Sequence, residues 1–197
     1  MTPQAESVLE LFRSTGAYLQ GHFRLTSGLH SAEYLQSALV LQHPAAAEKL
    51  GRMLADEVRK IAGEKIGLVV SPALGGLIIG HEVARALGTR FVFMEREAAT
   101  GQMALRRGFT ADSSEAAVVI EDVITTGGST RDVIEILQAN EVKVLAAGSI
   151  IDRSGGQADV SVHRVALATL QVAAHYPEHC PMCKLGIPAV KPGSRPA

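Results

Sequence analysis

The sequence predicts an α/β protein built on a doubly wound parallel sheet, and three observations carry this prediction. Short apolar runs rich in β-branched residues alternate along the chain with helical patterns. The runs are continuously apolar, as strands that are covered on both faces are. Parallel neighbours also need long crossovers, which lay helices over the sheet. The predicted strands cover residues 66–70, 90–94, 117–120 and 142–151, and the predicted helices cover 76–87 and 128–140.

The N-terminal part precedes this alternation and has a different character. Thr2 is a suitable N-cap for an opening helix that Gly16 ends. The following stretch, 18–40, consists of short apolar pieces broken at Gly21 and at Ser27-Gly28. Such a pattern is typical of loops and short strands rather than of a long helix.

A long helix and an irregular tail lie on either side of the predicted sheet. Apolar residues recur at helical spacing over 44–61. From Tyr176 onward the chain is rich in proline, so we expect an irregular segment that packs on a surface or on a neighbouring subunit. The length of 197 residues favours a single domain over 1–197. Within it we expect about 1–43 and about 171–197 to form a small flanking hood subdomain.

Composition and charge exclude several classes of partner. The chain has 19 Lys and Arg against 20 Asp and Glu, a net charge of −1, so it has no positive field to hold nucleic acid. Without Trp it also has little aromatic surface on which single-stranded bases stack. The longest stretch without a formal charge, 66–80, is shorter than the ~20 apolar residues that span a bilayer. We therefore expect a small-molecule partner, with no nucleic acid and no membrane.

The start of the chain and its cysteines bear on location and metals. No basic start followed by an apolar run is visible in residues 1–11, so the cytoplasm is the expected location. Cys180 and Cys183 form one C-x-x-C, which provides two of the usual four zinc ligands and needs the others from elsewhere. The seven histidines lack metal-binding spacings, so we assign none to catalysis. Whether the cysteines bind metal stays open.

The most informative segment is 118–130, VVIEDVITTGGST. It reads as a buried strand ending in two carboxylates, Glu121 and Asp122, before a Thr-Thr-Gly-Gly-Ser turn opens a helix. The glycines let N–H groups turn inward, the hydroxyls add donors, and the helix start contributes about +0.5 charge, which predicts a phosphate cradle. Carboxylates accept hydrogen bonds from vicinal hydroxyls, so a sugar phosphate would satisfy both halves. A plain polar turn with a capping hydroxyl is the alternative.

The run 119–129 resembles the phosphoribosyl pyrophosphate motif of the type I phosphoribosyltransferases, and its Thr-Thr-Gly-Gly-Ser form is similar to that of the orotate phosphoribosyltransferases. A second stretch, FRLTSGLHS over 23–31 followed by Tyr34, is similar to the signature that helps enclose the pyrimidine in that family. A third is Ile151-Asp152-Arg153, where the family places an arginine after a core strand. The resemblance covers nearly the whole chain.

The resemblance implies an enzyme, a pentosyltransferase. It implies Mg²⁺-assisted transfer of ribose 5-phosphate from phosphoribosyl pyrophosphate to orotate, giving orotidine 5′-monophosphate and pyrophosphate in de novo pyrimidine (UMP) synthesis. The Mg²⁺ is bound mainly through phosphoribosyl pyrophosphate, so no residue of the chain is assigned as a metal ligand. The family also implies a homodimer.

Site residues follow from the same resemblance. The 5′-phosphate falls to the cradle, the ribose hydroxyls to Glu121 and Asp122, and the orotate to Thr125 and Arg153, unless Arg153 is a plain surface arginine. The loop 71–76 has the position of the family's pyrophosphate loop. The phosphoribosyl pyrophosphate residues are Glu121, Asp122, Val123, Ile124, Thr125, Thr126, Gly127, Gly128 and Ser129.

The sequence departs from the family in its cations. The family commonly has a lysine in the loop 71–76 and another where Thr26 stands, and both are missing here. In the stretch that corresponds to the mobile catalytic loop, only Arg96 keeps its place clearly. We therefore expect Arg96, Arg106 and Arg107 to supply a cationic, catalytic lid with flexible glycines, closing over the partner subunit's site. Solvated charges on a hairpin are the alternative.

Two other functions remain open from the sequence. A phosphoribosyltransferase for a different base would keep 121–129 and give Arg153 no role. A regulator that senses phosphoribosyl pyrophosphate and binds nucleic acid would explain the altered lid, although the near-neutral charge argues against it.

Overall fold

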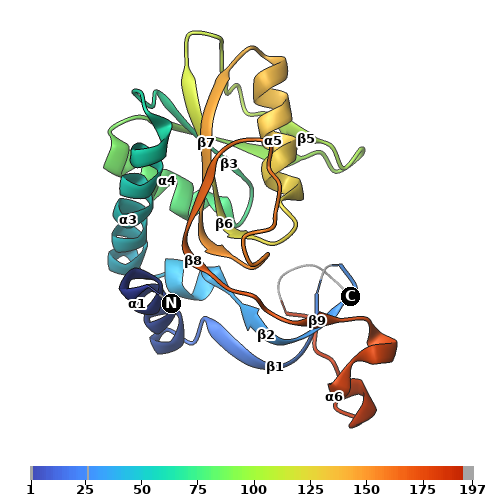
Figure 1. The fold of residues 1–197 in the computed structure, drawn as a ribbon. Coiled ribbons are helices and arrows are strands. Elements are labelled where there is room, and N and C mark those ends of the chain that lie inside the picture. Colours follow the sequence, from blue (N-terminus) through green and yellow to red (C-terminus); the bar gives the residue numbers. More distant parts are fainter. Residues whose placement is uncertain (1, 26, 193–197) are drawn as a thin grey trace.

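The computed structural model describes residues 2–25 and 27–192, and it contains the predicted α/β sheet. In the described residues six strands form this sheet in the order β5-β4-β3-β6-β7-β8 (Figure 1). All neighbours run parallel except β5, which is antiparallel to β4. The strands are β3 (Leu68–Pro72), β4 (Arg90–Arg96), β5 (Met103–Leu105), β6 (Ala116–Ile124), β7 (Lys143–Asp152) and β8 (Arg164–Thr169).

Helices cover both faces of the sheet, as a doubly wound fold requires. Figure 1 shows α1, α3 and α4 on one side and α5 on the other. Successive residues of β6 belong to different core clusters, Val118 and Ile120 to one and Ala117 and Val119 to the other. The predicted fold class is therefore confirmed. The helices are α1 (Pro3–Ser14), α3 (Pro44–Ala62), α4 (Gly76–Leu87) and α5 (Gly128–Ala139).

The helix boundaries follow from local chemistry. The Thr2 hydroxyl accepts a hydrogen bond from the Ala5 amide at 3.2 Å, which caps α1. Both α3 and α4 end at glycines in the left-handed region, Gly63 and Gly88, each with φ of 69°. The cap at Thr2 was predicted, and α3 and α4 agree with the predicted ranges 44–61 and 76–87 to within one residue.

A second, three-stranded sheet lies beside the first and has the order β1-β2-β9. Strand β1 (Tyr18–Arg24) continues through Gly21, so the predicted break is wrong: a bulge between Gln20 and Phe23 absorbs the irregularity. The short helix α2 (Ser37–Leu41) was not expected. The other elements are β2 (His30–Leu35), β9 (Ala174–His175), η1 (Pro177–His179) and α6 (Pro181–Lys184). Thr26 of the signature lies outside the described residues.

Two further differences concern the main sheet. The carboxylates Glu121 and Asp122 do not end their strand, because β6 continues to Ile124 while it pairs with β7. Strands β5, β8 and β9 were not predicted, since they are short or sit at sheet edges where the apolar pattern is weak. Across the described part of the chain, none of the helices has the length and apolar character that crossing a bilayer needs.

Candidate functional site

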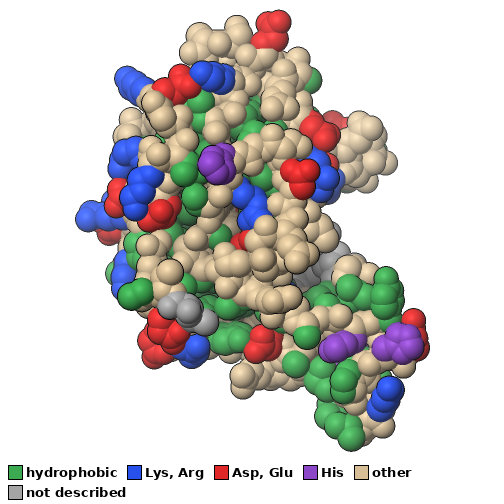
Figure 2. Space-filling view, viewed as in Figure 1, with side chains coloured by type: hydrophobic (Ala, Val, Ile, Leu, Met, Phe, Trp, Pro, Cys, Tyr) green, Lys and Arg blue, Asp and Glu red, His purple; other side chains and the backbone are tan. Residues whose placement is uncertain are grey.

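The carboxyl ends of β3, β6 and β7 bring the predicted site residues to one edge of the main sheet. Ligands bind at this edge in open α/β sheets. Gly75 follows β3, Thr125 follows β6 and Arg153 follows β7. Figure 2 shows the molecule hollowed between the part that holds the main sheet and the part that carries the three-stranded sheet. The candidate site therefore faces a recess between the two sheets.

The phosphate cradle, residues 125–129, forms the turn from β6 into α5. Gly127 adopts the left-handed conformation with φ of 79° and stands at the N-cap of α5. No side chain caps the start of α5. Its first N–H groups therefore remain available to an anion, and the helix dipole favours negative charge there. Thr125 and Thr126 are exposed, so their hydroxyls are accessible from the recess.

The carboxylate pair, Glu121 and Asp122, lies in β6 shortly before the cradle. Glu121 is buried, whereas Asp122 is half-buried and is the more accessible of the two. A Cβ added to Gly75 would lie 2.5 Å from Asp122 Oδ1. Only a glycine lets the loop after β3 approach this carboxylate so closely. Sequence reasoning missed this contact because the two residues are far apart in the chain.

Burial raises the pKa of Glu121 well above its ordinary value, and the neighbouring Asp122 carboxylate raises it further. A buried carboxylate beside a second one is most stable when it holds its proton. Both causes favour the protonated form of Glu121, and a carboxyl in that form repels an anionic sugar phosphate less than a carboxylate does.

This raised pKa predicts a pH-dependent stability. Below the ordinary pKa of 4.5, Glu121 is protonated in both the folded and the unfolded chain. As the pH rises past that value the unfolded chain ionises first, so the contribution of Glu121 to stability falls until the folded pKa is passed. This fall in the free energy of unfolding amounts to up to about 1.4 kcal/mol for each unit by which the pKa is raised. Glutamine does not ionise, so we expect the fall to be absent in Glu121→Gln. Urea unfolding of the ligand-free protein from about pH 5 to about pH 8 measures it. Parallel stability curves for the two proteins would contradict the raised pKa.

Arg153 directly follows β7, and hydrogen bonds of its own backbone and of its neighbour Asp152 fix its position. Its backbone N–H donates to Ile124 O at 2.8 Å. The preceding Asp152 is buried and accepts from Ser154 Oγ at 2.6 Å and from Arg164 Nη1 at 2.6 Å, which fixes the turn. This network places the guanidinium at the edge where the cradle begins.

The side chain of Arg153 lacks adequate partners. Its buried Nε has no hydrogen-bond partner, and Nη2 donates to Glu33 O at a long 3.4 Å. Burial lowers the pKa of Arg153, against smaller opposing effects of Tyr34 and Glu33. A desolvated guanidinium is costly unless an anion completes it. The position therefore suits a carboxylate ligand.

Tyr34 connects the three-stranded sheet to this edge. Burial raises the pKa of Tyr34, with Asp122 adding to the rise and Arg153 opposing it. Arg153 Nη2 donates to the backbone oxygen of Glu33, the residue before Tyr34 in β2, so β2 lies beside Arg153. The strand β2 that carries Tyr34 thus forms one side of the recess.

The structure separates Arg96 from the other two arginines of the predicted lid, Arg106 and Arg107, because Arg96 and Arg107 have different partners. Arg96 Nη2 lies 2.7 Å from Asp132 Oδ2 and 3.5 Å from Ser129 Oγ, beside the cradle. Arg107 instead forms a two-bond ion pair with Glu95, at 2.6 and 2.9 Å. Because Glu95 and Arg96 are adjacent on a strand, their side chains point to opposite faces of β4. Arg106 is exposed beside Arg107.

Comparisons with known proteins agree on one family. The phosphoribosyl transferase domain family matches residues 37–181. The chain is 53% identical over 190 residues to the orotate phosphoribosyltransferase of Pelotomaculum thermopropionicum, covering 96% of this chain and 97% of that protein. It is 50% identical to the orotate phosphoribosyltransferase of Heliobacterium modesticaldum, covering 96% and 98%. The crystal structure of orotate phosphoribosyltransferase from Aeropyrum pernix is similar with a TM-score of 0.68 and 26% identity, covering 83% of this chain and 94% of that one.

Proposed function

The chain belongs to the phosphoribosyltransferase family, and within it to the orotate phosphoribosyltransferases, and we propose which of its own residues perform the reaction. The enzyme transfers ribose 5-phosphate from phosphoribosyl pyrophosphate to orotate, giving orotidine 5′-monophosphate and pyrophosphate in pyrimidine synthesis. One observation carries the assignment: the uncapped start of α5, the carboxylate pair and the incompletely partnered Arg153 meet at one edge of the sheet.

Each group receives the part of the substrates that its chemistry suits. The cradle binds the 5′-phosphate through backbone N–H groups and hydroxyls. Asp122 and the more deeply buried Glu121 accept hydrogen bonds from the ribose hydroxyls. Arg153 makes a two-bond, charge-assisted contact with the orotate carboxylate, and Thr125 faces the pyrimidine.

In this reaction the protein mainly positions the two substrates and forms no covalent bond to them. Carbon 1 of the ribose becomes cationic as pyrophosphate leaves, so the site must hold the sugar rigidly, keep orotate in line and exclude water. The cradle after β6 would hold the 5′-phosphate, and Arg153 after β7 would hold the orotate carboxylate. Because these strands are neighbours, the two contacts would fix the relative position of the two substrates.

Mg²⁺ fits the residues at this edge. Asp122 is an accessible carboxylate, and Mg²⁺ prefers oxygen ligands, usually one or two carboxylates together with substrate phosphates and water. We therefore propose that phosphoribosyl pyrophosphate would provide most of the ligands of Mg²⁺ and that Asp122 is the carboxylate that would help to hold it. When bound, Mg²⁺ neutralises negative charge on the leaving pyrophosphate.

We propose that the segment after β4 acts as the lid, over the site of a partner subunit in a homodimer. Gly101 and Gly108 have positive φ values of 71° and 74°, which supports flexible points on either side of β5. The cations needed at the pyrophosphate must be arginines, because all six lysines lie outside the site loops. We propose a cytoplasmic location for the enzyme, where reducing conditions keep cysteines such as Cys180 and Cys183 from forming disulfides.

The lid makes a testable prediction. Joint replacement of Arg106 and Arg107 by alanine should lower kcat by more than tenfold, because two cations that stabilise the leaving charge are lost. Steady-state kinetics with saturating substrates measure this. Arg52→Ala is a suitable control, since Arg52 is exposed on α3 and pairs with Glu48 of the same helix, and it should leave kcat within about twofold. Unchanged turnover in the double variant would remove both residues from the mechanism.

A spectrophotometric assay tests the proposed function as a whole. We expect orotate absorbance to fall when phosphoribosyl pyrophosphate and Mg²⁺ are present, with pyrophosphate released in equal amount. Uracil or a purine base should release little pyrophosphate. Release with another base and not with orotate would indicate a different transferase. No release with any base, in folded protein that still binds phosphoribosyl pyrophosphate, would favour a regulator.

A further inference from the structure

Four side chains with metal-binding chemistry lie close together away from the substrate recess. They lie between the β1–β2 hairpin and residues 171–192, which we call the C-terminal segment. Their ligand atoms all lie within 4.8 Å of one another. His22 Nε2 is 2.8 Å from His30 Nδ1 and 3.4 Å from Cys180 Sγ, and Cys183 Sγ is 3.2 Å from His30 Nδ1. We call this group the His₂Cys₂ cluster; it consists of His22, His30, Cys180 and Cys183.

The orientation of His22 is fixed by its second ring nitrogen. Nδ1 lies 2.7 Å from the backbone oxygen of Ile187, which can only accept a hydrogen bond. Nδ1 therefore carries the proton, and Nε2 presents a lone pair to the cluster. A metal-binding histidine typically donates its other N–H to a carbonyl in this way.

Ligand type, number and charge together match zinc. Two thiolates and two neutral imidazoles are a common tetrahedral set for Zn²⁺. The two thiolate charges cancel the charge of the ion, so the filled site is neutral. Neutrality is important because His22, His30 and Cys180 are buried, at 5%, 7% and 0% exposure, and an uncompensated charge there would be costly.

The C-terminal segment has few other means of staying in place. Among the described residues, neither apolar core cluster nor its partly buried periphery includes a residue after Leu170. The segment instead exposes large apolar side chains. They are Tyr176, Leu185, Ile187 and Val190.

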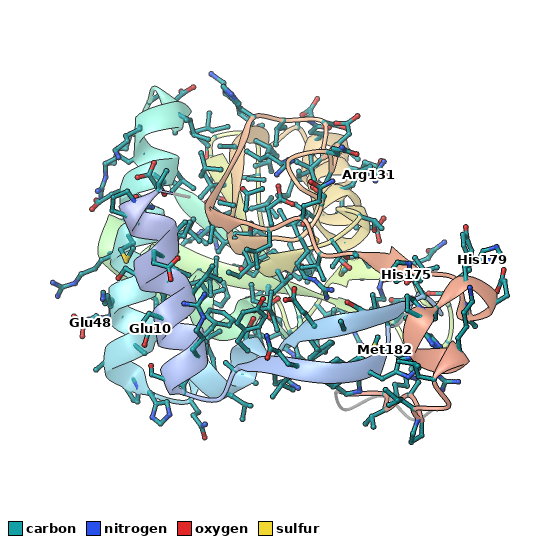
Figure 3. All side chains as sticks on the ribbon, turned by 60° about the horizontal axis from the view of Figure 1, so that its bottom comes forward. Glu10, Glu48, Arg131, His175, His179 and Met182 are labelled. Atoms are coloured by element: carbon teal, nitrogen blue, oxygen red, sulfur yellow. The ribbon has the colours of Figure 1, made fainter. Side chains whose placement is uncertain are left out.

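Backbone pairing shows that this segment straddles the hairpin. His175 pairs with His30 of β2 on one side, and Val190 exchanges two 2.8 Å hydrogen bonds with β1 on the other. Figure 3 shows the segment with His175, His179 and Met182 lying against the end of the hairpin. Cys180 and Cys183 lie between these two attachments along the chain. A metal ion bound by the cluster would link them to His22 and His30 of the hairpin. Small units without a sufficient core commonly use a metal for this purpose.

We propose that the His₂Cys₂ cluster is a structural zinc site that fastens the C-terminal segment to the β1–β2 hairpin. His30 stands in the stretch 23–31, but none of the four residues is among those assigned to phosphoribosyl pyrophosphate or orotate, so the zinc site can be tested separately from the catalytic assignment. Metal binding stabilises whatever order it requires, so the hairpin and the segment gain stability together.

Metal content tests the proposal directly. Protein purified without chelators should contain about one zinc ion per chain by mass spectrometry. The double variant Cys180→Ser with Cys183→Ser should contain less than about a tenth of that. His179→Asn is the matched control, because His179 is exposed next to Cys180 but lies outside the cluster, and it should keep its zinc. Cobalt substituted into the wild type should show the visible bands of a tetrahedral, thiolate-bound ion.

Proteolysis supplies a readout that does not depend on activity. Lys184 is exposed and directly follows Cys183, so it is a trypsin site within the fastened segment. Removal of the metal from the wild type should speed cleavage there by more than about tenfold, and added Zn²⁺ should restore protection. The double variant should be cut fast with or without zinc.

Three results would overturn the zinc site. The first is wild-type protein that contains no metal and does not bind added Zn²⁺ or Co²⁺. The second is a disulfide between the two cysteines in protein purified under reducing conditions. The third is equal loss of zinc in His179→Asn and in the double variant. Should the double variant fail to fold, the titration of wild-type protein still decides.

Discussion

Arg153→Ala is expected to lower kcat/KM for orotate by about 10² to 10⁴, because it removes two charge-assisted hydrogen bonds worth about 1.5–3 kcal/mol each. The KM for phosphoribosyl pyrophosphate should change by less than about threefold, since the proposed phosphate cradle follows the neighbouring strand, β6. Steady-state kinetics with each substrate varied in turn separate these effects.

The same variant should not lose stability. In the ligand-free protein Arg153 has a buried Nε without a partner, and burial lowers its pKa. Removing a desolvated cation that lacks an anion relieves an unfavourable burial, so the unfolding midpoint should stay the same or rise. A drop in both stability and activity would instead indicate a structural arginine.

Two comparisons make the assignment specific. Arg153→Lys keeps the charge but loses the planar fork, so its kcat/KM for orotate should lie between those of the wild type and the alanine variant. Uracil lacks the carboxylate, so the wild-type preference for orotate over uracil should largely disappear in Arg153→Ala. A preference that persists would place the carboxylate elsewhere.

The main sheet was predictable because its signals are local. Continuous apolar runs and glycine-terminated helices specify β3, β6, α3 and α4 within a few residues. The end of β6 was misjudged, since a polar pair normally marks a loop. Here Glu121 and Asp122 stay in the strand because β7 continues alongside them. Pairing with a partner far along the chain decides such a boundary, and a single sequence does not show it.

The candidate site was predictable to the extent that it is contiguous. The cradle is one run of residues, and the structure places it at the edge expected for a parallel sheet. The approach of Gly75 to Asp122 joins residues from different strands. The His₂Cys₂ cluster joins a hairpin to a segment about 150 residues later, so one C-x-x-C in the sequence indicated only half of it.

Gly127→Ala is expected to lower kcat/KM for phosphoribosyl pyrophosphate by about a hundredfold or more, the effect of misplacing a binding group by about 1 Å. An added Cβ would lie 2.8 Å from Val160 Cγ1 and 3.3 Å from Asp159 O, in a backbone conformation with φ of 79°. The methyl group therefore pushes the cradle away from the loop before β8 and turns its N–H groups off the phosphate. Calorimetric titration with phosphoribosyl pyrophosphate, without orotate, measures the loss of binding.

Gly128→Ala is the control that the chain itself offers. A Cβ at Gly128 would meet nothing closer than Thr126 Oγ1 at 3.7 Å, and its φ is not positive. We expect this variant to fold like the wild type and to bind phosphoribosyl pyrophosphate within about tenfold of it, because the backbone path is unchanged. If both variants lost the same affinity for phosphoribosyl pyrophosphate, the cause would be a methyl group close to the ligand and not the backbone conformation of the turn.

Val160→Ala added to Gly127→Ala separates the two causes of the loss. The second change removes the atom that the new methyl group would strike, so the part of the defect that is steric should be recovered. The cost of a left-handed alanine, about 1–2 kcal/mol, should remain. Partial recovery of binding is therefore the expected result, while no recovery would assign the whole effect to the backbone conformation. Recovery of binding in the double variant would show that the close approach of residue 127 to Val160 helps to set the turn before α5.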